Sequence, residues 1–316
     1  MRAFRILLVI LAVLPGGPLS AEDLADAPRT DAENAAGDWK PVTLSGASRI
    51  DLTSKETGRT YRVFVSTPDG TPPPSGWPVI YVLDGNAYFP TAHTLALVQA
   101  ELALSFGLPA PQPVVVAIGS PEPTLLDEEA RSEDYTPPAP DLSQTGDHRG
   151  HVQGGADRFL AFIETELKPR VESRIAIDRA RQSLIGHSYG GLFALHVLFT
   201  KPDAFRTYVA GSPSIWWNDR YILTERERFL ARRKEGSPEA RLLLTVGGAE
   251  QQPVPGRRGA MIETRRMVDN ARELADSLDG TAPGLSITFR QFDGENHYSS
   301  ALPMLQLGFD FIARGK

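Results

Sequence analysis

Residues 186–190 constrain the fold of this chain more than any other feature of its sequence. They read Gly-His-Ser-Tyr-Gly and lie between the short apolar run 183–185 and the longer apolar segment 192–199. A strand, a Gly-x-Ser-x-Gly turn and a helix in that order are typical of a sharp turn that strains the central serine. Glycine is needed on both sides because a larger side chain would not fit. We therefore expect the hydroxyl of Ser188 at the carboxyl end of a sheet, beside a helix N-terminus that favours negative charge.

The other apolar runs predict strands that alternate with helices. Buried strands are predicted over residues 79–83, 114–118, 206–210, 241–246 and 285–290. Helical periodicity is found over residues 91–106, 156–173, 259–278 and 301–313. This alternation favours a mostly parallel, twisted sheet with helices on both faces. Residues 49–53 and 60–66 flank a Lys-Glu-Thr-Gly turn and predict an N-terminal antiparallel hairpin. With the serine turn, these elements predict an α/β-hydrolase fold.

We predict one α/β-hydrolase domain over residues 39–316, with neither an internal repeat nor a second domain. Two segments interrupt the alternation of strands and helices. Residues 120–155 are rich in proline, acidic residues and glycine, which predicts a loop over the active site. Residues 220–236 are highly charged, which predicts a surface helix.

The amino end is typical of a secretory signal peptide. Arg2 and Arg5 precede an apolar run over residues 6–14, which is too short to span a bilayer. We predict a signal peptide over residues 1–21, cleaved near Ala21, and a flexible leader over residues 22–38. The mature protein is then expected in the periplasm or outside the cell, without stable membrane insertion. A retained membrane anchor is the alternative.

The composition excludes several classes of function. The chain has no cysteine, so it forms no disulfide, thiolate metal site or cysteine nucleophile. Its formal net charge of −6 argues against nucleic-acid binding, which needs a basic face. We find neither metal-ligand spacing nor a phosphate-binding glycine loop, and we expect no metal and no cofactor. The expected partner is a small-molecule ester, and no obligate protein partner is inferred.

A serine hydroxyl needs a base to remove its proton. In the α/β-hydrolase order, the histidine lies on a loop after the last strand, near the carboxyl end. The loop after the predicted strand 285–290 reads Gly-Glu-Asn-His-Tyr, so we expect His297 to be the base. His187 lies inside the serine turn, where its side chain is expected to point away from Ser188.

The third member of the site should orient the imidazole. The loop after the predicted strand 241–246 reads Gly-Gly-Ala-Glu, which favours Glu250 as the acid. Asp219 is the alternative carboxylate, and Glu295 is expected to face solvent. A Ser-His dyad, with the imidazole held by a backbone carbonyl, is the third possibility.

The oxyanion formed during ester hydrolysis needs two N–H donors. The first should be the backbone N–H of Tyr189, which follows the serine. The second should come from the loop after strand 79–83, where Gly85 and Asn86 are the candidates.

Several motifs together resemble the esterase family of α/β-hydrolases. The sequence is most similar to the branch of periplasmic ferric-siderophore esterases of the enterochelin esterase type. The likeness runs over about residues 39–313, and it is carried by Tyr-Val-Leu-Asp-Gly at 81–85, Gly-His-Ser-Tyr-Gly-Gly at 186–191, Ser-Pro-Ser-Ile-Trp-Trp at 212–217, Gly-Glu-Asn-His at 294–297 and Asp-Tyr-Thr-Pro at 134–137.

The resemblance implies hydrolysis of a catecholate siderophore trilactone in iron acquisition. Because ferric triscatecholates are anionic, the substrate would be held by cations and aromatic walls; the candidates are Arg131, Arg149, Trp216 and Trp217. At least one of the two tryptophans is expected to pack in the core instead. A general carboxylesterase, acyl hydrolase or acyltransferase acting on another ester or thioester is the alternative. A binding protein on an inactive hydrolase scaffold is a more distant one.

Overall fold

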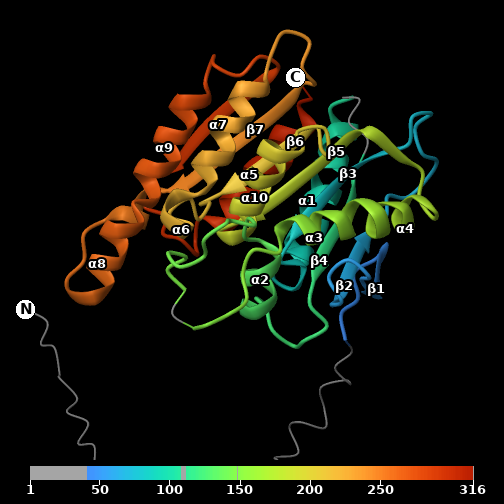
Figure 1. The fold of residues 1–316 in the computed structure, drawn as a ribbon. Helices are drawn as coiled ribbons and strands as arrows, with labels where there is room; N and C mark the ends of the chain where they lie inside the picture. Colours follow the sequence, from blue (N-terminus) through green and yellow to red (C-terminus); the bar gives the residue numbers. More distant parts are fainter. Residues whose placement is uncertain (1–40, 108–111, 148, 316) are drawn as a thin grey trace, which may run out of the picture. The chain divides into compact units, whose positions relative to one another are not determined.

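In the part of the chain that the structure describes, eight strands form one mixed sheet (Figure 1). We describe it from a computed structural model, which places residues 41–107, 112–147 and 149–315. The predicted signal peptide 1–21 and leader 22–38 lie outside the described residues. The compact unit that carries the sheet begins at Leu44.

The strand order is β1-β2-β4-β3-β5-β6-β7-β8. β1 pairs antiparallel with β2, β2 pairs antiparallel with β4, and all other neighbours are parallel. This confirms the predicted N-terminal hairpin and the mostly parallel sheet of an α/β-hydrolase. The strands are β1 (Ala47–Thr53), β2 (Thr60–Ser66), β3 (Trp77–Leu83), β4 (Val114–Gly119), β5 (Ile177–His187), β6 (Thr207–Gly211), β7 (Ala240–Gly247) and β8 (Leu285–Phe292).

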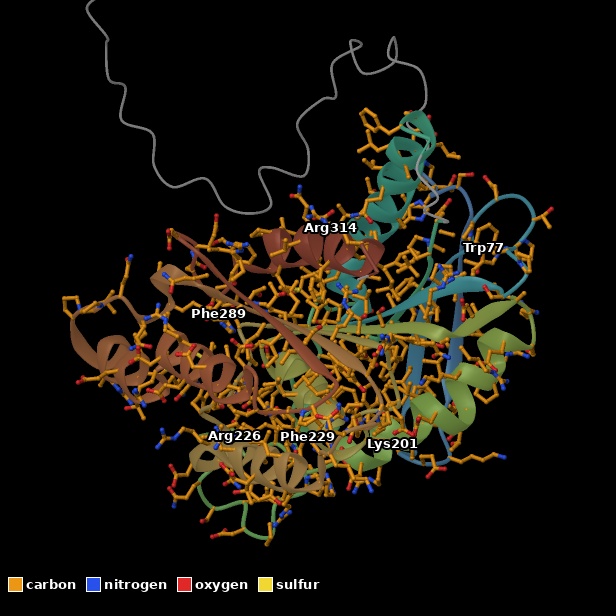
Figure 2. The ribbon with its side chains drawn as sticks, turned by 90° about the horizontal axis from the view of Figure 1, so that it is seen from above. Trp77, Lys201, Arg226, Phe229, Phe289 and Arg314 are labelled. Atoms are coloured by element: carbon orange, nitrogen blue, oxygen red, sulfur yellow. The ribbon has the colours of Figure 1, made fainter. Side chains whose placement is uncertain are left out.

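Helices cover both faces of the sheet, because the central strands are apolar on both sides. Along β3, Tyr81 and Leu83 belong to one apolar cluster, and Ile80 and Val82 belong to the other. Figure 2 shows two helices on opposite sides of β8, the strand of Phe289. One is α7 (Ile222–Arg232), which carries Phe229, and the other is α10 (Ala301–Ala313), which ends just before Arg314. The first cluster packs against α3 (Ala156–Phe162), α5 (Tyr189–Thr200), α7 (Ile222–Arg232) and α9 (Met267–Leu278), and the second packs against α1 (Gly85–Ser105) and α10 (Ala301–Ala313).

Three predicted helices differ from the observed ones. α1 begins at Gly85 rather than after Pro90, so Pro90 lies inside the helix, where its missing N–H removes one backbone hydrogen bond. The predicted helix 259–278 is two helices, α8 (Gly256–Arg265) and α9, separated by Arg266 in a left-handed conformation (φ 43°). The predicted helix 156–173 is α3, a π-helical turn (Ile163–Leu167) and α4 (Lys168–Glu172).

The segment 120–155 is not entirely loop. It contains the short helix α2 (Glu128–Asp134), which is capped by Asp127: the N–H of Ala130 donates to Oδ1 of Asp127 at 3.1 Å. The segment 220–236 forms α7 and the short helix α6 (Trp217–Arg220) precedes it. A short 3₁₀ helix (Gly248–Gln251) follows β7.

His196 joins three helices inside the protein. Its ring lies on α5 with 1% of the side chain exposed, and it contacts Glu225 of α7 at 2.8 Å and Asp157 of α3 at 3.0 Å. Burial alone would lower the pKa of His196, but the hydrogen bonds to Asp157 and Glu225 outweigh it and raise the pKa to about 9. The imidazolium therefore stabilises the helix layer that follows the serine turn.

We predict that the free energy of unfolding falls as pH rises from about 6.5 to 9. Since the folded pKa of His196 lies above the unfolded value of about 6.5, its contribution is complete below that pH and is lost as pH passes the folded pKa. The loss should be on the order of 3 kcal/mol. Urea unfolding at pH 6.5 and 9 measures it, and His196→Gln should flatten the difference. An equal loss in both proteins would contradict the assignment.

Candidate active site

Ser188 occupies a strained turn between β5 and α5. Its backbone has φ 61° and ψ −118°, and its N–H donates to the carbonyl of Gly211 on β6 at 2.9 Å. A Cβ on Gly186 would lie 2.1 Å from the carbonyl oxygen of Gly190. A Cβ on Gly191 would lie 2.7 Å from the carbonyl oxygen of Gly211. Glycine is therefore required where the turn packs on itself and on the neighbouring strand.

The structure brings Ser188, His297 and Glu250 into one hydrogen-bonded chain. His297 follows β8, and its Nε2 lies 2.9 Å from Oγ of Ser188. Its Nδ1 lies 2.6 Å from Oε2 of Glu250, which follows β7. With Nδ1 protonated and donating to the carboxylate, Nε2 is free to accept the serine proton. The arrangement can therefore activate a serine hydroxyl.

The Glu250 carboxylate is buried and fully hydrogen-bonded. Its Oε1 accepts from the N–H of Gly247 at 2.7 Å and from the hydroxyl of Ser212 at 2.5 Å. Only 1% of its side chain is exposed. A buried carboxylate with satisfied oxygens is held in one orientation, so the imidazole bound to it is also fixed. Ser212 was not anticipated from the sequence, which carries no local signal for this contact.

The loop that carries Glu250 and the loop that carries His297 are packed closely together. The N–H of Ala249 donates to the carbonyl of Glu295 at 2.9 Å, and a Cβ on Gly247 would lie 2.4 Å from that same oxygen. Glu295 thus links the loops through its backbone. Asp219, the alternative acid, is exposed.

His187 lies beside the site, and among the described residues its side chain hydrogen-bonds to Ser300, while Oγ of Ser188 is bonded to His297. Its ring is 4.9 Å from that of His297, and its Nε2 is 3.4 Å from Oγ of Ser300. Burial lowers the pKa of His187 well below its ordinary value, and the nearby His297 and Arg131 lower it further. A neutral His187 avoids placing a second positive charge against the His297 imidazole.

The candidate oxyanion donors lie at two neighbouring helix N-termini. Tyr189 is the first residue of α5, and Gly85 and Asn86 begin α1. These N–H groups have no carbonyl one turn earlier in their own helix. Because β3 and β5 are adjacent, with Val82 opposite Ile185, both helices begin at the same edge of the sheet.

Asn86 and Gly85 also have packing roles. The Asn86 side chain donates to the carbonyls of Ser120 and Thr124 at 3.0 and 2.8 Å, which fixes the start of the insert. A Cβ on Gly85 would lie 3.0 Å from the backbone of residues 117–119 in β4. The side-chain amide of Asn86 is therefore already hydrogen-bonded to the insert, so a contact with an oxyanion at this loop would come from a backbone N–H group.

Arg131 is buried against Asp84 rather than open to substrate. Its Nε lies 2.7 Å from Oδ1 of Asp84, and 8% of its side chain is exposed. Asp84 itself has a left-handed backbone (φ 55°), and its N–H donates to the hydroxyl of Tyr135 at 3.3 Å. The guanidinium expected to bind an anion instead neutralises Asp84 and holds the turn that begins α1. Removing one member of such a buried pair typically costs about 3–5 kcal/mol.

The other three substrate-binding candidates are placed differently from one another. Trp217 is fully buried in the first core cluster, and its Nε1 donates to Gln153 at 2.5 Å, so it is the tryptophan of the pair that packs in the core and does not line the site. Trp216 is half-buried, with its ring centroid 6.2 Å from that of Tyr189. Arg149 is exposed and pairs with Glu128 at 3.0 Å.

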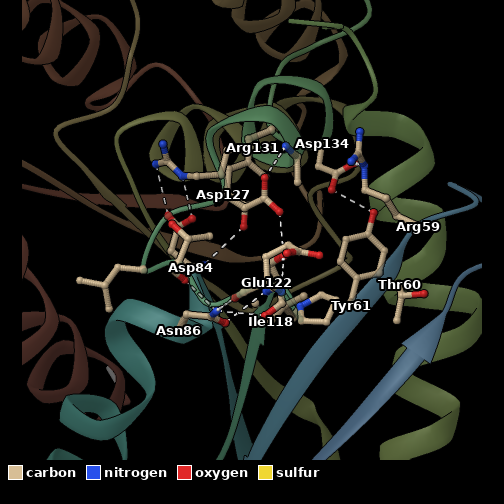
Figure 3. Close-up of a pocket in the computed structure, with 17 residues that line it drawn as sticks. Arg59, Thr60, Tyr61, Asp84, Asn86, Ile118, Glu122, Asp127, Arg131 and Asp134 are labelled. Carbon is tan, nitrogen blue, oxygen red and sulfur yellow. Dashed lines mark hydrogen bonds and ion pairs between the residues drawn. The ribbon is translucent and has the colours of Figure 1, made fainter.

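A cavity of about 370 Å³ lies next to the α1 N-terminus (Figure 3). Acidic side chains outnumber basic ones on its wall, and Figure 3 shows the hydroxyl of Tyr61 directed at Asp134. Burial raises the pKa of Asp134 to about 7. The charged residues that line the cavity are Arg59, Asp84, Glu122, Asp127, Arg131 and Asp134. Neither Ser188 nor His297 lies on its wall, so this cavity is separate from the hydrogen-bonded chain of Ser188, His297 and Glu250.

The described residues contain no cluster of three or more histidine, aspartate or glutamate side chains placed to hold a metal ion. Within the same part of the chain, no helix combines the length and apolar character needed to cross a membrane.

A mostly parallel sheet with a Ser-His-Glu chain at the carboxyl ends of its strands defines an α/β-hydrolase. Residues 54–282 match the Esterase family model, and the chain belongs to this family of ester-hydrolysing enzymes. It is 40% identical over 283 residues to the ferri-bacillibactin esterase BesA of Bacillus subtilis, covering 87% of this chain and 92% of the relative.

Two further relatives agree with this assignment. The siderophore enterobactin esterase of Emericella nidulans is 39% identical over 251 residues, covering 74% of this chain and 81% of the relative. The solved structure of the siderophore hydrolase EstA from Aspergillus nidulans is 35% identical and superposes with a TM-score of 0.75, covering 88% of this chain and 99% of that one.

We predict that Glu250→Gln lowers kcat by on the order of 10³- to 10⁴-fold. If the Gln oxygen accepts from Gly247, its NH₂ faces Nδ1 of His297 and favours the tautomer whose Nε2 already carries a proton. Steady-state ester hydrolysis measures the loss, with Glu295→Gln as the matched control. A loss below tenfold for Glu250→Gln would favour the Ser-His dyad.

Proposed function

We propose that this esterase hydrolyses the ester bonds of a catecholate siderophore trilactone, with Ser188, His297 and Glu250 as its catalytic residues. The observation that carries the catalytic assignment is the unbroken hydrogen-bonded chain from Ser188 through His297 to Glu250. The substrate assignment is supported by relatives that are named as esterases of bacillibactin and enterobactin.

The first half of the reaction forms an acyl-enzyme. His297 Nε2 takes the proton from Ser188 as Oγ attacks the ester carbonyl carbon, and Glu250 stabilises the imidazolium that results. The carbonyl oxygen becomes an oxyanion that accepts from the N–H of Tyr189 and from that of Gly85 or Asn86. One such donor contributes on the order of 3 kcal/mol in the transition state. When the ester C–O bond breaks, His297 gives its proton to the departing alcohol.

The second half releases the acid. A water molecule loses a proton to Nε2 of His297 and adds to the acyl carbon, forming a second tetrahedral intermediate at the same donors. His297 then returns the proton to Oγ of Ser188 as the acyl–serine bond breaks. One water is consumed per ester bond, and the products are a carboxylic acid and an alcohol.

We further propose that the protein is exported and acts in the periplasm or outside the cell. The basis is the sequence of residues 1–21, with arginines before an apolar run that ends near small residues. Ester hydrolysis there would act on a siderophore without requiring its entry into the cytoplasm.

We predict that the wild-type protein hydrolyses ferric enterobactin with a kcat/KM far above that for p-nitrophenyl butyrate, and that Ser188→Ala abolishes both reactions. Product mass and steady-state rates measure the preference. Ser173→Ala, which changes an exposed serine after α4, should leave the rates unchanged. Equal or reversed preference would identify a general carboxylesterase, and residual turnover in Ser188→Ala would remove Ser188 from its role.

A further inference from the structure

A guanidinium stacks on the tryptophan beside the catalytic serine. The guanidinium carbon of Arg265, the last residue of α8, lies 4.0 Å from the centre of the Trp216 ring. Trp216 in turn faces Tyr189, the residue after Ser188, with 6.2 Å between ring centroids. Arg265, Trp216 and Tyr189 thus form a row that leads to the nucleophile.

The insert supports this row from the other side. A Cβ on Gly146 would lie 3.0 Å from an edge atom of the Trp216 ring, so the insert backbone touches the indole. The side-chain amide of Asn218 donates to the carbonyl of Asp141 at 2.7 Å, which ties the insert to the chain just after the tryptophan pair. Trp216 is therefore fixed between the insert and α8.

Arg265 differs from Arg131 and Arg149, because no acidic partner lies beside it among the described residues. Arg131 is paired with Asp84 at 2.7 Å, and Arg149 is paired with Glu128 at 3.0 Å. Among the residues that the structure describes, no carboxylate oxygen lies within 4.0 Å of the Arg265 guanidinium. A half-buried cation without a counter-ion has lost hydration that an incoming anion can replace.

The stacked geometry determines what Arg265 can bind. A guanidinium that lies flat on an aromatic ring keeps its in-plane N–H groups free to donate to oxygen anions. The adjacent indole offers an aromatic surface to a planar ring. The pair therefore suits an aryl group that carries ionised oxygens. The cavity at α1 does not, because four of the six charged side chains on its wall are carboxylates.

We propose that Arg265, stacked on Trp216, binds an ionised catecholate ring of the substrate and selects the iron-loaded trilactone over the iron-free form. This inference rests on the proposed siderophore substrate. Phenol oxygens have a pKa near 10 and stay protonated at neutral pH, whereas oxygens that coordinate a metal ion are deprotonated. A cation without a partner would thus attract the ferric substrate and gain little from neutral catechols.

The test compares Arg265→Met with Arg257→Met, a change of an exposed arginine on the same helix. Each protein is assayed with ferric enterobactin, iron-free enterobactin and p-nitrophenyl butyrate. Arg265→Met should lower kcat/KM for ferric enterobactin on the order of 10- to 100-fold, the size expected for a charge-assisted hydrogen bond. It should change the other two reactions by less than threefold, and Arg265→Lys should recover part of the ferric activity.

The p-nitrophenyl butyrate rate and thermal melting show that the variant is folded. An unchanged ferric rate in Arg265→Met, or an equal loss on all three substrates, would overturn the role of Arg265 and leave the proposed substrate standing. If wild type hydrolyses p-nitrophenyl butyrate but neither form of enterobactin, the proposed substrate fails and this inference fails with it.

Discussion

The strained turn at Ser188 is the constraint on which the site depends. A non-glycine residue at φ 61° and ψ −118° costs on the order of 1–3 kcal/mol, which the surrounding structure must supply. The buried sheet and the mostly apolar helix α5 provide that support, since residues 189–199 are buried without exception. The strain places the hydroxyl where the histidine loop after β8 can reach it.

Buried carboxylates are used as structural anchors throughout the site. Glu250 holds His297, Asp84 holds Arg131, and Glu225 holds His196, each within 2.6 to 2.8 Å. In the pair of Asp84 with Arg131, the carboxylate neutralises a buried guanidinium beside the turn that begins α1. We therefore propose Arg265 as the guanidinium that recognises an anionic substrate, because none of the described residues places a carboxylate beside it.

The sequence predicts the site residues that directly follow strands. It does not predict residues whose role depends on partners that are distant in the sequence. Ser188, His297 and Glu250 could be proposed because each follows a readable apolar run, and the structure brings them into contact. Parallel strands bring their carboxyl ends to one edge, so order along the chain predicts proximity. The alternating strands and helices likewise predicted the sheet, because both faces must be apolar.

Side-chain burial was the main source of error. Two adjacent tryptophans look alike in sequence, so which of them packs in the core could not be predicted: Trp217 is in the core, and the half-buried Trp216 lies beside Tyr189. Arg131 was expected to meet the substrate, but it is paired with Asp84, which follows β3 and is distant from Arg131 in the sequence. Arg265 was not proposed at all, because its stacking partner is distant in sequence and the break at Arg266 that ends α8 has no glycine or proline to mark it.

Covalent capture of the protein with diisopropyl fluorophosphate tests the activated serine most directly. Intact mass, peptide mapping and residual esterase activity would be followed in the same reaction. We predict one adduct per chain, on the peptide that contains Ser188, formed at the rate at which activity is lost. Full activity after complete reaction, or inactivation with the adduct on another residue, would contradict the assignment of Ser188, His297 and Glu250.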